Sequence, residues 1–299
     1  MKPRIVGMPP NHKAPSTTNP HAPHSNARSA RAWALQTLCV NDPAAKVHQT
    51  HALYAASNSR GPGGAWVDPA EVLSAPADAM LPGRPARLNL ISPTEVPQRS
   101  PFTAEGLAAL VHAICHIEFN AINLALDAVW RYDGMPQGFY RDWLRVADEE
   151  ATHFGLLHEH LQDLGYVYGD FAAHDGLWEM CLKTQDSVTA RMALVPRTLE
   201  ARGLDATPLI QARLRKVNSP QALRVVDILD IILRDEIGHV AVGNRWYGWL
   251  CEQQGLEPLA HYRLLARQHK APRLKPPFNT EARLRAGFSQ PEIEALGEP

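Results

Sequence analysis

The sequence of 299 residues has few of the features that mark membrane or secreted proteins. No uncharged apolar run reaches the ~18 residues that a membrane-spanning helix needs. No apolar stretch follows the N-terminal Met-Lys-Pro-Arg, so we expect no secretory signal. The four cysteines, at positions 39, 115, 181 and 251, form no Cys-x-x-Cys pair, which argues against a disulfide scaffold or a zinc knuckle. These absences predict a cytoplasmic protein that binds no membrane.

Several enzyme motifs are absent as well. The sequence has no phosphate-binding loop, no Gly-rich dinucleotide fingerprint, no Gly-x-Ser-x-Gly elbow and no His-Glu-x-x-His pair. Chemistry must therefore come from another arrangement of side chains.

Charge is distributed unevenly although the net charge is only −1. Residues 1–41 carry five basic residues and no acid, whereas residues 263–285 carry seven basic residues and one acid. The segment between them is acidic. A basic arm can bind RNA or another polyanion, or it can be ordinary solvated surface; the sequence leaves both interpretations open.

The chain divides by composition into four parts. Residues 1–28 are rich in Pro, Ser, Thr, Asn and His and predict a disordered tail. Residues 29–101 predict an N-terminal helix, over 29–57, followed by a Pro/Gly-rich connector. Residues 102–255 have helical periodicity and few breakers, and residues 256–299 form a basic C-terminal extension.

The central part predicts four long helices, over residues 103–132, 139–164, 177–202 and 220–254. Thr103 is the expected N-cap of the first, and Gly165, Gly203 and Gly255 are the expected stops of the others. A short helix is expected to begin at Pro208. Helices of this length joined by short turns predict an all-α fold, a four-helix bundle.

Two Glu-x-x-His motifs carry the chemistry. Residues three apart share one face of a helix, so Glu150 and His153 point the same way, as do Glu236 and His239. Each pair lies within an apolar stripe, where a carboxylate is costly unless it is paired or binds a metal.

Two lone glutamates complete the pattern. Glu118 precedes the turn near residue 136 by 18 residues, and Glu150 follows it by 14, so the two heights match in an antiparallel hairpin. Glu200 holds the corresponding place before Glu236. Pro196 is expected to kink the helix there, so Glu179 is a second, less favoured candidate.

Ferritin-like di-iron and di-manganese proteins have a ligand pattern of this kind: one Glu from each of two helices, and a Glu-x-x-His motif from each of the other two. We therefore predict two iron ions, with manganese or a mixed pair as the alternative, bound by Glu118, Glu150, His153, Glu200, Glu236 and His239. Glu149 and Asp235 are expected to hold the ligand histidines through their second ring nitrogen, and His116 is a further candidate for this supporting role.

The sequence resembles a known family. The six ligands look like those of the ferritin-like di-iron carboxylate superfamily, and residues 102–285 are similar to an uncharacterised bacterial family in it, domain of unknown function 455. The resemblance rests on His112–Glu118, Asp142–Glu150, Tyr168–Trp178, Leu194–Arg202, Arg234–His239 and Pro276–Asn279. It implies a ferritin-like bundle and a dinuclear metal site, but no substrate.

Three functions follow as hypotheses. The first is an oxygen-activating oxidase or hydroxylase, with a small-molecule or anionic substrate and an external electron donor if it is an oxygenase. The second is ferritin-type iron or peroxide handling. The third is a non-enzymatic scaffold that binds RNA through residues 263–285. A homodimer is compatible with each of them.

Overall fold

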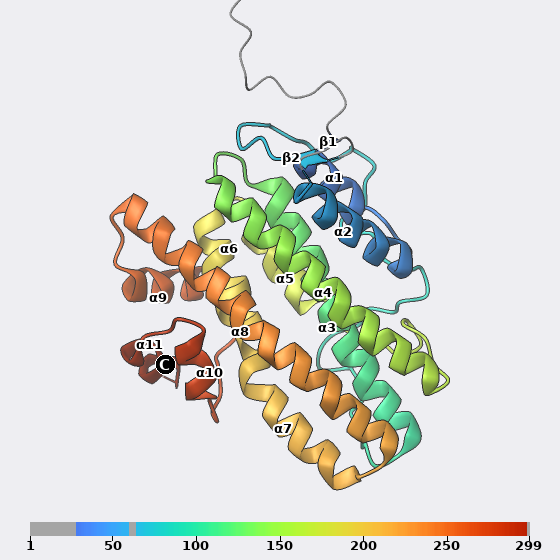
Figure 1. The fold of residues 1–299 in the computed structure, drawn as a ribbon. Helices are drawn as coiled ribbons and strands as arrows, with labels where there is room; N and C mark the ends of the chain where they lie inside the picture. Colours follow the sequence, from blue (N-terminus) through green and yellow to red (C-terminus); the bar gives the residue numbers. More distant parts are fainter. Residues whose placement is uncertain (1–27, 60–63, 298–299) are drawn as a thin grey trace, which may run out of the picture.

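The computed structural model describes residues 28–59 and 64–297, so the predicted tail lies outside the described residues except for Arg28. Long helices lie side by side and form the body of the protein (Figure 1). The fold is all-α, as the sequence predicted. The body consists of α3 (Ala104–Arg131), α4 (Gln137–Asp163), α8 (Pro220–Gln254) and a composite segment of α6 (Val188–Leu194), η1 (Val195–Glu200) and α7 (Ala201–Val217).

The α3–α4 hairpin forms where the sequence predicted it. The Thr103 side chain caps α3 by accepting a hydrogen bond from the Gly106 amide at 3.1 Å. Gly134 adopts a φ of 71°, a left-handed conformation that glycine takes without steric cost, and so allows the turn between the helices. Because the turn is short, the two helices pack antiparallel along their apolar stripes.

The third of the long helical segments differs from its prediction. A single helix over 177–202 that stops at Gly203 is wrong: α5 (Gly176–Lys183) ends first, and the Ser187 side chain then caps α6. The helix also continues through Gly203 and Pro208 to Val217, so no separate helix begins at Pro208. Packing against α8 outweighs the ~1 kcal/mol cost of one helical glycine and the hydrogen bond lost at proline.

The segment η1 is a π-helical turn that contains Pro196. Proline has no amide hydrogen to donate to the carbonyl four residues earlier, and its ring clashes with that carbonyl. The helix widens there, and the Thr198 hydroxyl donates to the Ala193 carbonyl, five residues earlier, at 2.8 Å. Gly243 of α8 lies opposite: a Cβ built on it would be 2.6 Å from Pro196 Cβ. The two segments therefore approach closely because residue 243 has no side chain.

The described residues before the connector cover the outside of the body of long helices. One helix over 29–57 was expected, but α1 (Ala30–Leu38) and α2 (Pro43–Ser57) are separate, because Asp42 caps a new helix that begins with proline. They pack on α3 and α4 respectively (Figure 1). The fully buried Arg31 donates to the Trp130 carbonyl at 2.8 Å, near the end of α3. Strands β1 (Arg28–Ser29) and β2 (Ala65–Trp66) pair in parallel beside them.

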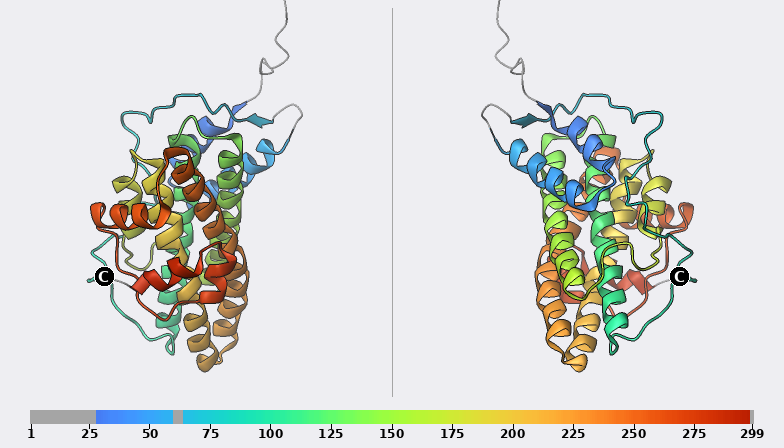
Figure 2. Two further views of the ribbon diagram at one scale, coloured as in Figure 1. Left: turned by 90° about the vertical axis from the view of Figure 1, so that its left-hand side faces the viewer. Right: turned by 90° about the vertical axis from the view of Figure 1, so that its right-hand side faces the viewer.

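From residue 67 to residue 103 the connector contains no helix or strand. At the other end of the chain, short helices lie against the composite segment and α8 (Figure 2). These are α9 (Pro258–Gln268), α10 (Thr280–Arg285), α11 (Gln290–Glu294) and η2 (Ala295–Gly297).

Helix α3 runs through the core and carries buried polar groups. In the described part of the chain it is the one helix long and apolar enough to span a membrane, but 78% of that apolar window is buried inside the protein. Asp127 of α3 is fully buried, and Arg191 of α6 and Arg131 both pair with it. The distance from Arg191 Nη1 to Asp127 Oδ2 is 2.5 Å. This ion pair fixes α6 against α3.

Candidate metal centre

Three helices bring the two Glu-x-x-His motifs and Glu118 together in the core. Glu150 and His153 lie on the inner face of α4, and Glu236 and His239 on the inner face of α8, because residues three apart share a helix face. Glu118 reaches the same place from α3. The side chains of all five are at most 10% exposed. Ligand atoms of Glu118, Glu150, His153 and Glu236 lie within 4.8 Å of one another, and this group could hold a metal ion.

Glu150 lies between the two histidines. Its Oε2 is 3.3 Å from His153 Nδ1, and its Oε1 is 2.8 Å from His239 Nδ1. Glu118 Oε2 lies 3.4 Å from His153 Nδ1, and Glu236 Oε1 lies 3.5 Å from His239 Nδ1. The ring centroids of the histidines are 5.7 Å apart. The cluster therefore has two halves, each with a histidine and a glutamate of its own, and one carboxylate that faces both.

Glu200, at the end of η1, lies near enough to this cluster to interact electrostatically with Glu236, Glu150 and His239. Its Oε2 is buried, and burial raises its pKa, as do the nearby carboxylates of Glu236 and Glu150. Glu179 is exposed on α5 and lies outside the cluster. The widened turn at Pro196 explains the position of Glu200: the helix does not end after it, as the sequence had suggested, but continues as α7.

Each histidine is held from the opposite helix. His153 of α4 contacts Asp235 of α8, with 3.2 Å from Nε2 to Oδ2. His239 of α8 contacts Glu149 of α4, with 2.7 Å from Nε2 to Oε2. A carboxylate accepts, so Nε2 donates in both cases, and Nδ1 of each ring is directed at the cluster. The acid that precedes each motif thus orients the histidine of the other motif.

Several inward-facing atoms are buried without a hydrogen-bond partner among the described residues. They are Glu118 Oε2, Glu150 Oε1, Glu200 Oε2, Glu236 Oε2 and His239 Nδ1. Although Glu150 Oε1 and His239 Nδ1 approach closely, they do not align as donor and acceptor. Unpaired buried acceptors are costly. A divalent cation would satisfy them, so this donor set of carboxylates and imidazoles fits a metal such as iron, manganese or zinc.

The cluster holds protons in the absence of metal. Burial raises the pKa values of Glu118 and Glu236, and the adjacent Glu150 carboxylate raises them further. Burial also disfavours the charged form of His153, but the Glu118 and Glu150 carboxylates outweigh it and raise its pKa to about 11. Burial acts against the charged form of His239 as well, but the Glu150 and Glu149 carboxylates outweigh it and raise the pKa of His239. Burial opposes ionisation of Glu150 too, yet the neighbouring histidines bring its pKa below the usual range.

His116 does not belong to this cluster. Its Nδ1 lies 2.7 Å from the Tyr168 hydroxyl and its Nε2 lies 3.0 Å from the His174 carbonyl oxygen. Burial lowers its pKa to about 4, so the ring is neutral near pH 7. His116 connects α3 to the loop before α5. Among the hydrogen bonds of the described residues, none joins His116 to His153 or His239, as a supporting role would require.

The comparisons with known proteins agree with the part of the sequence resemblance that concerns domain of unknown function 455. The model of a family described as a protein of unknown function, DUF455, matches residues 39–294. The chain belongs to this family. The match extends beyond residues 102–285 at both ends, so it includes α2, the connector and helices α9 to α11. An uncharacterised protein of Haemophilus influenzae is 51% identical over 227 residues, which cover 74% of this chain and 77% of that protein. No solved structure matches the chain significantly.

Proposed function

We propose that this member of the DUF455 family is a dinuclear metal protein with a ferritin-like four-helix bundle, and that it is an oxygen-activating oxidase or hydroxylase. The observation that carries the proposal is the reciprocal arrangement of the two Glu-x-x-His motifs. Each motif supplies a histidine Nδ1 and a carboxylate to the same buried centre, and each supplies the acid that orients the other histidine. A buried site with this doubled design suits two ions.

The residues divide between two metal positions. Glu118 and His153 would serve one position, and Glu200 and His239 the other. Glu150 faces both histidines with one oxygen each and would bridge, and Glu236 is the second candidate for a bridge. Four carboxylates would offset the charge of two divalent cations, and one imidazole per ion leaves coordination positions free for substrate or dioxygen.

Iron held by these residues would supply electrons for the reduction of dioxygen, and an external reductant would be needed to restore them. Two features of the chain's own residues would support metal binding at this site. Asp235 and Glu149 keep a proton on Nε2 of each histidine, so Nδ1 is the nitrogen that would bind a metal once its own proton is released. The surrounding apolar core excludes water from the cluster, which strengthens every charge interaction within it.

Metal content is the test of this proposal. The protein is purified without added metal, reconstituted anaerobically with ferrous iron and measured by elemental analysis, beside the double variant Glu150→Ala/His239→Ala. About two irons per chain in the wild type and a loss in the variant are expected. The wild type should then consume dioxygen in its ferrous form. If neither protein retains metal after reconstitution, the proposal is wrong.

The other two hypotheses receive less support. Arg283, one of the seven basic residues of the C-terminal segment, is fully buried and pairs with Asp205 within the protein, so it does not contribute to a surface for RNA. Ferritin-type storage predicts oxidation of many irons per chain without an organic substrate, and the same reconstitution measures this number.

A further inference from the structure

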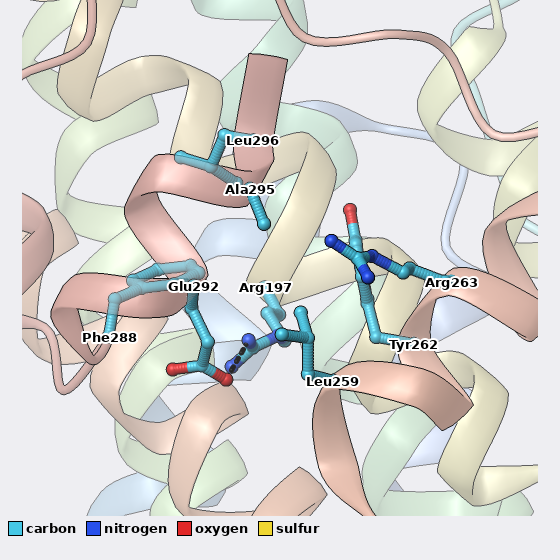
Figure 3. A pocket seen from close by; sticks show the side chains of 8 residues that line it. All are labelled: Arg197, Leu259, Tyr262, Arg263, Phe288, Glu292, Ala295 and Leu296. Carbon is cyan, nitrogen blue, oxygen red and sulfur yellow. Dashed lines mark hydrogen bonds and ion pairs between the residues drawn. The ribbon is translucent and has the colours of Figure 1, made fainter. Parts of the chain in front are cut away.

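The outer side of the π-helical turn η1 is covered by the C-terminal helices. Arg197 lies in this turn, three residues before Glu200, and is only 5% exposed. Its Nη1 donates to Asn244 Oδ1 of α8 at 2.6 Å. Its Nη2 pairs with the Glu292 carboxylate of α11 (Figure 3). The turn that carries Glu200 thus also carries an arginine held by two other helices, α8 and α11.

Aromatic rings enclose the same guanidinium. The centroids of Phe288, Tyr247 and Tyr262 lie 4.7, 5.2 and 5.5 Å from Arg197 Cζ. They come from three different parts of the C-terminal half of the chain. A hollow of only about 20 Å³ remains beside Arg197, which is room for about one water molecule. This hollow is too small for a small-molecule ligand, and the anionic group that pairs with Arg197 is the Glu292 carboxylate (Figure 3).

A second attachment holds the residue that follows Glu200. The fully buried Arg283 of α10 pairs with Asp205 of α7, with 2.6 Å from Nη2 to Oδ2, and donates to the Ala201 carbonyl at 3.3 Å. The Asn279 side chain donates to the Leu204 carbonyl at 3.1 Å. The C-terminal helices therefore grip the chain on both sides of Glu200.

We propose that residues 279–294 form a brace that positions Glu200, acting through Arg197 and Ala201, and thereby set the metal affinity of the position that Glu200 serves. This inference rests on the proposed function. A π-helical turn contains one residue more than the α-helix it interrupts. If the turn relaxed to an α-helix, Glu200 would rotate by about 100° relative to α6 and leave the cluster. The clamp on Arg197 opposes this relaxation, which makes Arg197 and Glu292 positioning residues.

Glu292→Gln is a selective test. Glutamine replaces glutamate in capping boxes, so the N-cap contacts with Ser289 survive while the charge opposite Arg197 is lost. Asp142→Asn is the matched control. Asp142 also pairs with an arginine, Arg245, and its side chain is 21% exposed, against 15% for Glu292. The side-chain partners of Asp142, Arg245 and Trp246, belong to α8 and not to η1.

Metal binding is the first readout. Wild type, both variants and Glu292→Asp are titrated anaerobically with ferrous iron by calorimetry. Loss of a group that supports a ligand costs 10- to 100-fold in metal affinity. We expect this loss at one of two positions in Glu292→Gln, no change in Asp142→Asn, and partial recovery in Glu292→Asp, which retains the charge. Two unchanged positions, or equal weakening of both, would overturn the brace.

Hydrogen exchange of the metal-free proteins is the second readout, and it does not depend on metal binding. Glu292→Gln should accelerate amide exchange in residues 197–203, and Asp142→Asn should not. If the wild type binds no iron, the proposed function fails, and the exchange comparison alone decides the brace. Equal exchange of residues 197–203 in all the proteins would refute it.

Discussion

Gly243→Ala should destabilise the protein, although alanine is a better helix former than glycine. An added Cβ would lie 2.6 and 2.7 Å from Pro196 Cβ and Cγ, whereas non-bonded carbons prefer about 3.5–4.0 Å. A proline ring cannot rotate away, so the turn η1 or helix α8 must move. Overpacking of this kind costs roughly 1–3 kcal/mol. With an overlap of about 1 Å we expect the upper half of that range.

Gly248→Ala on the same helix is the control. A Cβ at Gly248 meets no atom within 4 Å. This variant should gain up to about 1 kcal/mol from helix propensity, and the same gain offsets part of the loss in Gly243→Ala. The latter should therefore be less stable than the wild type by about 1–2 kcal/mol, and the two variants should differ by about 2–3 kcal/mol.

Urea unfolding of the metal-free proteins, followed by circular dichroism, measures this difference. Iron titration of the same variants adds a second result: because Pro196 precedes Glu200 in one turn, Gly243→Ala should weaken one metal position and Gly248→Ala neither. If Gly243→Ala is as stable as Gly248→Ala and binds iron like the wild type, the close approach of α8 does not hold the π-helical turn, and the reasoning is wrong.

Three further predictions concern buried charge. Asp127→Asn leaves Arg191 buried without its counterion and should cost about 3–5 kcal/mol in urea unfolding; a loss below 1 kcal/mol would contradict this. Burial disfavours the Asp127 carboxylate, but the arginines outweigh it and lower its pKa, so its contribution is complete above the unfolded pKa of about 3.9 and is lost as pH falls through the folded value. Asp235→Asn and Glu149→Gln should each weaken iron binding 10- to 100-fold at the position whose histidine they orient, as titration would show; equal affinities would contradict the assigned roles. The raised pKa values of the cluster histidines mean that metal loading releases protons, so apparent affinity should rise with pH below about 11 for His153. Calorimetry in two buffers of different ionisation enthalpy counts these protons, and a count of zero would refute the protonated metal-free state.

Much of the centre was visible in the sequence because local periodicity determined it. Helices α3, α4 and α8 carry apolar stripes interrupted by single acids, and these stripes indicated the inward face on which Glu118, Glu150 and Glu236 lie. The short turn at Gly134 set the relative heights within the first hairpin. Caps at Thr103 and Gly255 marked helix ends correctly. The apolar stripes, the turn and the caps each depend on residues that are close in sequence. They could therefore be predicted without knowledge of the tertiary structure.

What the sequence did not reveal depends on contacts between distant segments. Pro196 widens its helix instead of ending it because α8 packs against the turn through Gly243. The residues next to Lys46 in the sequence do not predict that its side chain is buried. Its ammonium group donates to the Gly83 carbonyl at 2.7 Å and to Asn123 Oδ1 at 2.6 Å, both of which come from distant segments. The grip of the C-terminal helices on Arg197 likewise joins residues about a hundred positions apart. Tertiary partners decided these cases, and periodicity carries no information about them.

The reciprocal orientation of the two histidines has a consequence for biosynthesis. On the ribosome, the α3–α4 hairpin emerges with Glu118, Glu150 and His153, but the acid that orients His153 belongs to α8 and is still to be synthesised. Glu149 of α4 is likewise synthesised before His239 of α8, the histidine that it orients. The nascent hairpin therefore carries only part of the cluster until α8 has been synthesised. On the proposed function, the complete ligand set is available to a metal ion only after α8 has been synthesised and has packed against α4.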